Sequence, residues 1–227
     1  MESFFCKTQT LITLKISQRL TTVLKWRRLT GIVLNRCLNI MVDMAMHLMD
    51  ISQNSIRADA KNIQIAFNED CESSRLTFRV GDDGNGMNEE ELRSLEDPFF
   101  TTRTTRKVGL GIPLLKMTCE QTGGFLTVES EAGKGTIVQA VYCTDNPDCL
   151  PLGDIAGYLT MLIVANPDIR IKFTYRLNDK EFKLDTDELK EQEIDLRQSG
   201  LPGLLKPFIA ENLKELFFHR AEKSFLC

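Results

Sequence analysis

The stretch that decides the fold of this chain lies at residues 80–87, and it reads Val80-Gly81-Asp82-Asp83-Gly84-Asn85-Gly86-Met87. Residues 75–81 alternate apolar and polar side chains, so a strand is predicted to end here. The alternate glycines that follow permit positive φ and let a flat ligand approach the backbone. An Asp at the strand end can accept a hydrogen bond from an exocyclic amine such as that of adenine. An ordinary Asp/Gly turn is the alternative, whereas a calcium loop is disfavoured because its spaced acids and terminal Glu are missing.

Upstream of this stretch, the spacing of Leu48 and Ile51 predicts a helix that begins at Met44. Asp50 and Asn54 are four residues apart, so they lie about 40° from each other on one side of that helix. A carboxylate beside a carboxamide can hold a hydrated magnesium ion and orient a water molecule. Taken alone, the pair is more typical of a solvated helix face than of a metal site.

Downstream, a third segment combines aromatic, hydroxyl and basic side chains with two glycines: Pro98-Phe99-Phe100-Thr101-Thr102-Arg103-Thr104-Thr105-Arg106-Lys107-Val108-Gly109-Leu110-Gly111-Ile112. Residues 97–108 are predicted as a loop and residues 109–122 as a helix. Backbone amides at a helix N-terminus attract phosphate, and neighbouring Arg and Lys side chains add charge-assisted hydrogen bonds. The segment is not a Walker phosphate loop, because no Gly-Lys-Ser/Thr follows.

The three segments together resemble the asparagine, glycine and phenylalanine boxes of the GHKL superfamily of DNA gyrase, heat-shock chaperone, histidine kinase and mismatch-repair ATPases. The resemblance covers residues 44–143, and the turn at 131–136 looks like the final hairpin of histidine-kinase catalytic domains. It is closest to small stand-alone bacterial ATP-binding proteins. By this resemblance Asn54 binds Mg²⁺ and Asp82 binds adenine. The nucleotide site that it implies consists of Asn54, Asp82, Gly84, Gly86, Met87, Phe99, Thr101, Thr102, Arg106, Lys107, Gly109, Leu110, Gly111 and Thr136.

The resemblance also implies a fold and an activity. The fold is α+β, a Bergerat-type sandwich with a mixed, mostly antiparallel sheet, helices on one face, and ATP held under a lid. The activity is slow hydrolysis of Mg²⁺-bound ATP or phosphotransfer to a protein partner, and an ATP-dependent regulatory switch is the alternative. Asp50 is the candidate catalytic base, although hydrolysing members carry Glu there. His47 lies inside the nucleotide-binding helix, so we expect it to be a structural residue or a residue at the rim of the pocket rather than a phosphoacceptor.

Charge and composition divide the chain into three predicted parts. Residues 1–40 carry seven basic residues and one acid, and are predicted to be a disordered basic leader or the product of a misassigned start. Residues 41–145 are the predicted ATP-binding domain. Residues 146–227 are a predicted α+β extension, in which helices are expected at 153–165, 185–193 and 202–219 and a hairpin at 169–184.

Partners and location follow from the same composition. The net charge is −4, and the chain without its leader is more acidic still, so a nucleic-acid partner is not expected. No stretch approaches the ~18 apolar residues of a membrane helix. Seven scattered cysteines favour free thiols in a reducing cytoplasm. A protein partner and a second copy of the chain are the candidate binding partners, besides ATP.

Overall fold

The computed structural model describes residues 43–95, 111–218 and 220. These residues belong to one compact unit that begins at Asp43. In chain order its elements are α2 (Met44–Arg57), β1 (Asn62–Asp70), β2 (Arg75–Asp82), α3 (Glu89–Ser94), α4 (Gly111–Gln121), β3 (Phe125–Glu131), β4 (Gly135–Cys143), α5 (Ile155–Ala165), β5 (Arg170–Leu177), β6 (Lys180–Asp185), α6 (Thr186–Glu191) and α7 (Leu201–Phe217).

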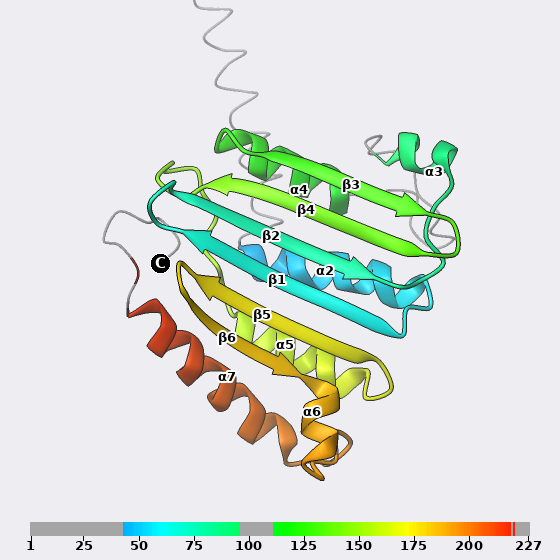
Figure 1. Cartoon of the computed structure of the whole chain (residues 1–227), viewed down its shortest axis with the longest axis vertical. Helices are drawn as coiled ribbons and strands as arrows, with labels where there is room; N and C mark the ends of the chain where they lie inside the picture. Colours follow the sequence, from blue (N-terminus) through cyan, green and yellow to red (C-terminus); the bar gives the residue numbers. More distant parts are fainter. Residues whose placement is uncertain (1–42, 96–110, 219, 221–227) are drawn as a thin grey trace, which may run out of the picture. The chain divides into compact units, whose positions relative to one another are not determined.

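The six strands form one sheet in the order β3-β4-β2-β1-β5-β6 (Figure 1). Four of the five pairings are antiparallel. The exception is the parallel pair of β1 with β5, which runs from Asn62 opposite Arg170 to Glu69 opposite Leu177. This pair joins the two halves of the chain, because β5 and β6 come from the predicted extension. The boundary predicted at residue 146 therefore falls within one continuous sheet.

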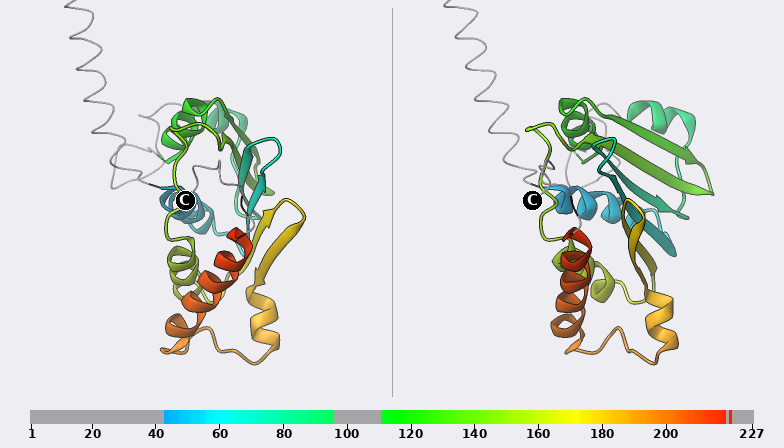
Figure 2. Two further views of the ribbon diagram at one scale, coloured as in Figure 1. Left: turned by 90° about the vertical axis from the view of Figure 1, so that its left-hand side faces the viewer. Right: turned by 60° about the vertical axis from the view of Figure 1, so that its left-hand side comes forward.

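Helices α2, α4, α5 and α7 lie on one side of the sheet, as the two side views show (Figure 2). The strands alternate accordingly: Ile63, Ile65 and Phe67 of β1 are buried, while the residues between them are more exposed. The ring of Phe67 stacks on Phe78 at 4.8 Å and on Tyr175 at 5.4 Å. Because the apolar side chains of all four central strands point to the helices, a single core forms between the layers. The predicted fold class is confirmed.

A buried ion pair links the end of α7 to the middle of the sheet. Arg220 donates from Nη2 to Oε2 of Glu69 on β1 at 2.9 Å, and the two side chains are 8% and 1% exposed. The hydroxyl of Tyr175 on β5 donates to the same carboxylate oxygen at 2.7 Å. Burial raises the pKa of Tyr175, so this hydroxyl stays protonated and remains a donor. The cation of Arg220 and the neutral hydroxyl of Tyr175 thus both compensate the buried carboxylate.

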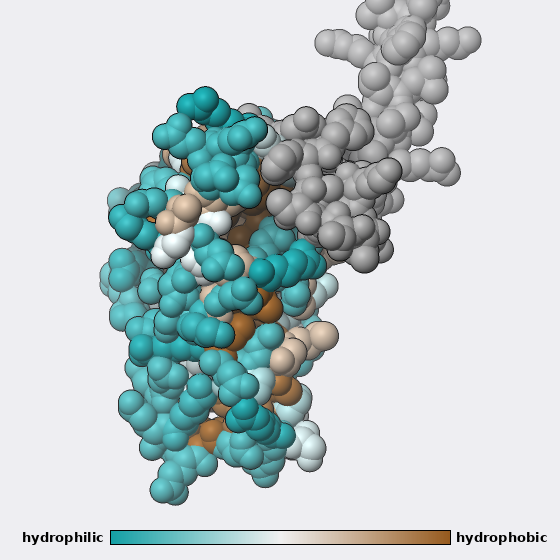
Figure 3. Space-filling model, turned by 90° about the vertical axis from the view of Figure 1, so that its right-hand side faces the viewer, coloured by the Kyte–Doolittle hydropathy of each residue, from teal (hydrophilic) through white to brown (hydrophobic). Residues whose placement is uncertain are grey.

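On the side drawn in Figure 3, hydrophilic residues cover most of the surface, and hydrophobic ones show mostly in hollows between them. Across the described ranges, no helix has both the length and the apolar character that crossing a bilayer requires. The cysteines at positions 71, 119, 143 and 149 are free thiols.

Candidate functional site

Helix α2 provides one wall of the candidate site. Asp43 caps it by accepting from the backbone N–H of Met46 at 2.9 Å. Leu48 and Ile51 anchor the helix in the core. The last turn and a half then presents Asn54 and Arg57 to a cavity on the helical side of the sheet.

Asp82, at the end of β2, is held in a fixed orientation at this cavity. Its Oδ2 accepts from the hydroxyl of Ser55 on α2 at 2.6 Å, and its Oδ1 accepts from the backbone N–H of Gly84 at 3.0 Å. Thr136 of β4 lies directly opposite it in the sheet. Each carboxylate oxygen keeps a further lone pair, so Asp82 can still accept a hydrogen bond from a ligand in the cavity.

The neighbouring acid, Asp83, has a structural role instead. It accepts from the backbone N–H groups of Lys61 and Asn62 and from the side-chain amide of Asn62, all within 2.8 Å. Burial raises the pKa of Asp83, but these hydrogen bonds outweigh that effect and hold the pKa below its ordinary value. Of the two adjacent carboxylates, one faces the cavity and the other ties β2 to the start of β1.

The two glycines after Asp83 are required by the protein's own packing. A Cβ on Gly84 would lie 2.6 Å from the carbonyl oxygen of Ala58, at the end of α2. Gly86 has φ of +62°, and a Cβ there would lie 2.0 Å from the carbonyl oxygen of Glu131. The sequence analysis assigned these glycines to the close approach of a ligand. In the described residues, it is the chain itself that approaches them closely, at the end of α2 and at the β3–β4 hairpin.

The hairpin completes the floor of the cavity. Ser130 of β3 accepts from the backbone N–H of Met87 at 2.8 Å, and its hydroxyl lies 2.8 Å from that of Thr136. Met87 and Thr136 both line the cavity. The loop that contains the motif and the β3–β4 hairpin are therefore joined at one edge of the site, by a hydrogen bond between residues 43 positions apart in the chain.

The cavity has a volume of about 350 Å³ and combines an apolar lining with few polar groups. Ile51, Ile112, Val128 and Val138 contribute the apolar part, and Asn54, Ser55, Asp82 and Thr136 contribute polar groups. That composition and size are typical of a small-molecule site, in which apolar surface supplies affinity and a few polar atoms fix orientation. Across the described ranges, no group of three or more His, Cys, Asp or Glu side chains is placed so that it could hold a metal ion.

Asp50 occupies a different position from Asn54. A Cβ on Gly111, the first residue of α4, would lie 2.9 Å from Oδ2 of Asp50. The carboxylate therefore packs against the N-terminus of α4, where the helix dipole favours a negative charge. Among the described residues that line the cavity, Gly111 is present and Asp50 is not.

Seven of the residues expected at the nucleotide lie outside the described ranges: Phe99, Thr101, Thr102, Arg106, Lys107, Gly109 and Leu110. Asn54, Asp82, Gly86, Met87, Gly111 and Thr136 are brought together around the cavity. Sequence reasoning missed Ser55 and Arg57. Arg57 donates to Oδ1 of Asn54 at 3.3 Å. Its position one turn after Asn54 was the available signal, since residues three apart on a helix face each other.

His47 is buried in the core, as expected for a structural residue. Its Nε2 lies 3.1 Å from the hydroxyl of Thr118 on α4, and that hydroxyl lies 3.1 Å from the phenol oxygen of Tyr142 on β4. Nδ1 has no hydrogen-bond partner among the described residues. Burial lowers the pKa of His47 to about 4, so the ring is neutral at pH 7. It links α2 to α4 and is closed to a phosphoryl donor.

This burial predicts a pH dependence of stability. The pKa of His47 in the folded chain, about 4, lies below its ordinary value of 6.5, so the unfolded chain takes up the proton first. Stability should be complete above pH 6.5 and should fall by about 3 kcal/mol as the pH decreases to 4. We expect urea unfolding at both pH values to show this extra loss relative to His47→Gln, which cannot be protonated. Equal pH dependence in the two proteins would contradict the prediction.

Comparison with known proteins adds four findings. Residues 42–145 match the family model described as "Histidine kinase-, DNA gyrase B-, and HSP90-like ATPase". Sporulation kinase C of Bacillus subtilis is 34% identical over 93 residues, 41% of this chain and 22% of that protein. Sensor kinase CckA of Brucella abortus is 30% identical over 132 residues, 52% of this chain and 14% of that protein. The crystal structure of the N-terminal domain of a DNA repair protein aligns with a TM-score of 0.49 and 15% identity, over 72% of this chain and 59% of that one.

The two kinases are much longer than the region in which they match. The aligned part of the chain spans less than a quarter of the length of either kinase.

Proposed function

Residues 42–145 are a GHKL-type ATPase domain, and from this premise we propose that the protein binds ATP with Mg²⁺ in the cavity between α2 and the sheet. The bound nucleotide is then hydrolysed slowly, or its γ-phosphate is transferred to a protein partner. The observation that carries the proposal is the geometry of Asp82, whose carboxylate is oriented by Ser55 and Gly84 beside a largely apolar cavity. A fixed acceptor in such surroundings suits the exocyclic amine of adenine.

The residues around the cavity fit a magnesium nucleotide. The amide of Asn54 lines the cavity, and its Oδ1 has a second lone pair beside the one that Arg57 occupies, so it can serve as a hard oxygen ligand. The guanidinium of Arg57 adds a positive charge beside that oxygen, and Arg suits phosphate oxygens geometrically. The metal, when bound, neutralises charge on the phosphates. Asn54 and Arg57 would hold the phosphate end, and Asp82 the base.

The second candidate function is a regulatory switch that binds ATP without consuming it and acts through partner binding. The position of Asp50 favours this alternative, because its carboxylate packs on Gly111 instead of lining the cavity. An acid in that position can couple the start of α4 to α2 without touching a reacting group. The two functions therefore differ in what happens to the γ-phosphate.

Incubation of the full chain with γ-labelled ATP separates the candidates. Released phosphate identifies an ATPase, label on this or another added protein identifies a kinase, and saturable ATP binding with neither identifies the switch. Absence of ATP binding at millimolar concentration, in a chain that is folded by circular dichroism, would contradict all three.

Recognition of adenine is predicted to depend on Asp82. Asp82→Asn places an amide where the carboxylate accepts, so a charged-group hydrogen bond is lost, which is worth about 1.5–3 kcal/mol. ATP affinity measured by calorimetry should fall by about 10–150-fold. GTP, which has a carbonyl in place of the amine, should bind the unmodified chain poorly.

Asp83→Asn is the matched control, because Asp83 is the adjacent residue of the same type but accepts from Lys61 and Asn62. It should keep the ATP affinity of the unmodified chain within about threefold while lowering the melting temperature. Equal affinities for ATP and GTP would remove Asp82 from the recognition of the base.

A further inference from the structure

Strand β6 is one of the two edges of the sheet. It follows a two-residue turn, Asn178-Asp179, and Leu177 pairs with Lys180 directly across that turn. A pair flanking so short a turn exchanges both backbone hydrogen bonds, and such pairs alternate along an antiparallel ladder. The N–H and C=O groups of Glu181 and Lys183 therefore point away from β5. Within the described ranges no strand pairs with that side of β6.

The charges on this edge complement themselves. Glu181 and Lys183 flank Phe182, both are exposed, and Glu181 accepts from Arg176 at 3.0 Å as well as from Lys183. If a second copy of β6 pairs antiparallel with the first and is centred on Phe182, each Glu181 lies opposite a Lys183. Opposite charges that face each other across strands stabilise a pair, and like charges destabilise it.

The other edge, β3, lacks this property. Glu129 and Glu131 flank Ser130 there, so the same centred pairing would place like charges opposite each other. The two edges of the sheet thus differ in their pattern of charges. In this centred pairing, the charges of β6 attract those of a second β6, and the charges of β3 repel those of a second β3. Edge charges commonly prevent sheets from joining, and β3 follows that rule.

The helical side of β6 carries apolar surface that the chain itself leaves open. The ring of Phe182 packs edge-on against Phe208 of α7, with centroids 6.1 Å apart. Phe208 is nevertheless 48% exposed, and Leu204, one turn earlier on α7, is 72% exposed. These are two of the five large apolar side chains that are exposed in the described residues. Aromatic residues at the centre of a charged rim are typical of protein interfaces.

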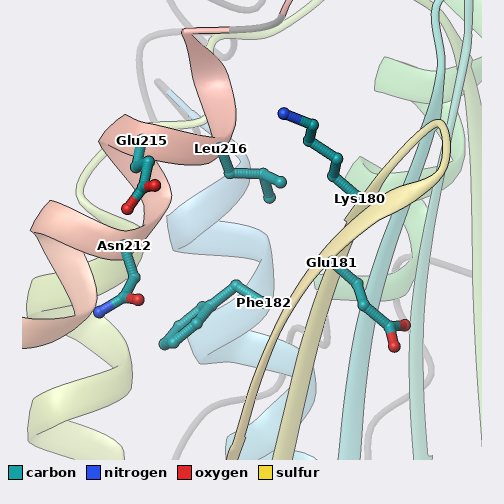
Figure 4. A pocket seen from close by; sticks show the side chains of 6 residues that line it. All are labelled: Lys180, Glu181, Phe182, Asn212, Glu215 and Leu216. Carbon is teal, nitrogen blue, oxygen red and sulfur yellow. The ribbon is translucent and has the colours of Figure 1, made fainter.

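A hollow of about 340 Å³ separates β6 from α7, so the helix does not fill the space beside the edge. Figure 4 shows the ring of Phe182 pointing toward α7, the helix that carries Asn212 and Leu216, whereas Glu181 points away from that helix. The polar and apolar contacts of a second copy would accordingly lie on opposite faces of the joined sheet.

We propose that two copies of this chain associate through β6, antiparallel and centred on Phe182, to form one continuous sheet. The outward backbone groups of Glu181 and Lys183 bond to those of the second copy. The side chains of the same residues make two reciprocal ion pairs on the open face. Phe182 and Phe208 with their counterparts form the apolar centre on the helical face. This association is independent of the proposed nucleotide chemistry, because none of these residues lines the ATP cavity.

The test is an exchange of charges in the full chain. Lys183→Glu would place Glu opposite Glu, and Glu181→Lys would place Lys opposite Lys, so each variant alone should dissociate at least tenfold more readily than the unmodified dimer. An equimolar mixture of the two variants restores both ion pairs and should dimerise again as a heterodimer. Size-exclusion chromatography with light scattering, over a range of concentrations, measures all four samples.

A backbone control isolates the strand pairing. Lys183→Ala and Lys183→Pro both remove the charge, but only proline removes the outward N–H, which an edge strand tolerates. Proline should weaken the dimer at least tenfold more than alanine, with melting temperature and ATP affinity unchanged in both variants. Two results would overturn the proposal. One is an unmodified chain that stays monomeric at a concentration of about 100 μM, at which even a weak dimer with a micromolar dissociation constant would form. The other is an equimolar mixture of the two charge variants that does not dimerise. A dimer that ignores the charge and proline variants but is lost in Leu204→Ser would place the contact on α7 and would equally overturn pairing through β6.

Discussion

Replacing Asp50 by Asn is expected to lower ATP turnover by about 10²–10⁴-fold, the usual contribution of a general base. Asp50 is the carboxylate one turn before Asn54, the proposed metal ligand, and it packs against the first residue of α4. Gly111 itself lines the cavity, so the carboxylate lies next to that lining, and a catalytic role requires it to reach a water molecule or a partner hydroxyl there. ATP affinity should stay within about threefold of that of the unmodified chain, because Asn has the same shape as Asp and the residues proposed to hold the adenine ring are unchanged. Single-turnover phosphate release and calorimetry on the same preparation measure the two quantities.

A second substitution moves Asp50 without removing it. A methyl group at position 111 would lie 2.9 Å from Oδ2 of Asp50, so Gly111→Ala should displace the carboxylate, which is the movable partner in that contact. Misplacement by about 1 Å can cost about a hundredfold in rate, so turnover should fall while the acid is retained. Asn54→Ala is the contrasting variant, because it should lose Mg²⁺-dependent binding of ATP more than binding of ADP.

The regulatory switch predicts a different pattern. If Asp50→Asn leaves turnover unchanged with intact ATP binding, Asp50 is removed from the chemistry. A joint fall of melting temperature and affinity would identify Asp50 as a support of the α2–α4 contact. Asp50→Asn should slow phosphotransfer and hydrolysis alike. The two reactions are distinguished by where the label of γ-labelled ATP is found, on a protein or in free phosphate.

Truncation of Arg220 should be the most destabilising single change outside the cavity. Arg220→Ala removes this cation from Glu69, whose side chain is 1% exposed and which also accepts from the neutral hydroxyl of Tyr175. Breaking a buried pair in this way costs about 3–5 kcal/mol. The cation–π contact of Arg220 with Phe217, at 4.0 Å, is lost as well. Urea unfolding at pH 7 should report the decrease in the free energy of unfolding.

Two controls separate charge from packing. Adding Glu69→Gln to Arg220→Ala removes the uncompensated charge and should recover a large part of the loss. Arg93→Ala breaks an ion pair with Glu89 whose side chains are 81% and 88% exposed, so it should change stability by less than about 1 kcal/mol. A loss from Arg220→Ala that is no larger than that from Arg93→Ala would show that Glu69 is not held by this pair.

Much of the architecture was readable from local pattern. The strand predicted at residues 75–81, the helix predicted to begin at Met44 and the hairpin predicted at 169–184 all have boundaries close to those found. Such features depend on interactions within a few residues, which periodicity records directly. The order of the motifs likewise indicated that the end of β2 and the last turns of α2 belong to one site.

Other features were decided by contacts between distant segments. The parallel pairing of β1 with β5 joins residues more than a hundred positions apart, and nothing in either strand specifies the neighbour. The pairing brings the apolar faces of both strands into one core with residues of α2, α5 and α7. This explains why the predicted extension is part of the sheet.

The local sequence pattern also could not predict which of two similar residues lines the cavity and which stabilises the fold. Asp82 and Asp83 are chemically identical neighbours, and only the position of Ser55 on α2 and of Asn62 on β1 assigns one to the cavity and the other to the fold. His47 and Asn54 share a side of α2, yet one is buried against Thr118 and the other lines the cavity. The sequence by itself determined which groups exist and which elements carry them. The packing of α2, α4 and the sheet decided which of them water and ligands can reach, because burial is a property of the surroundings and not of the residue.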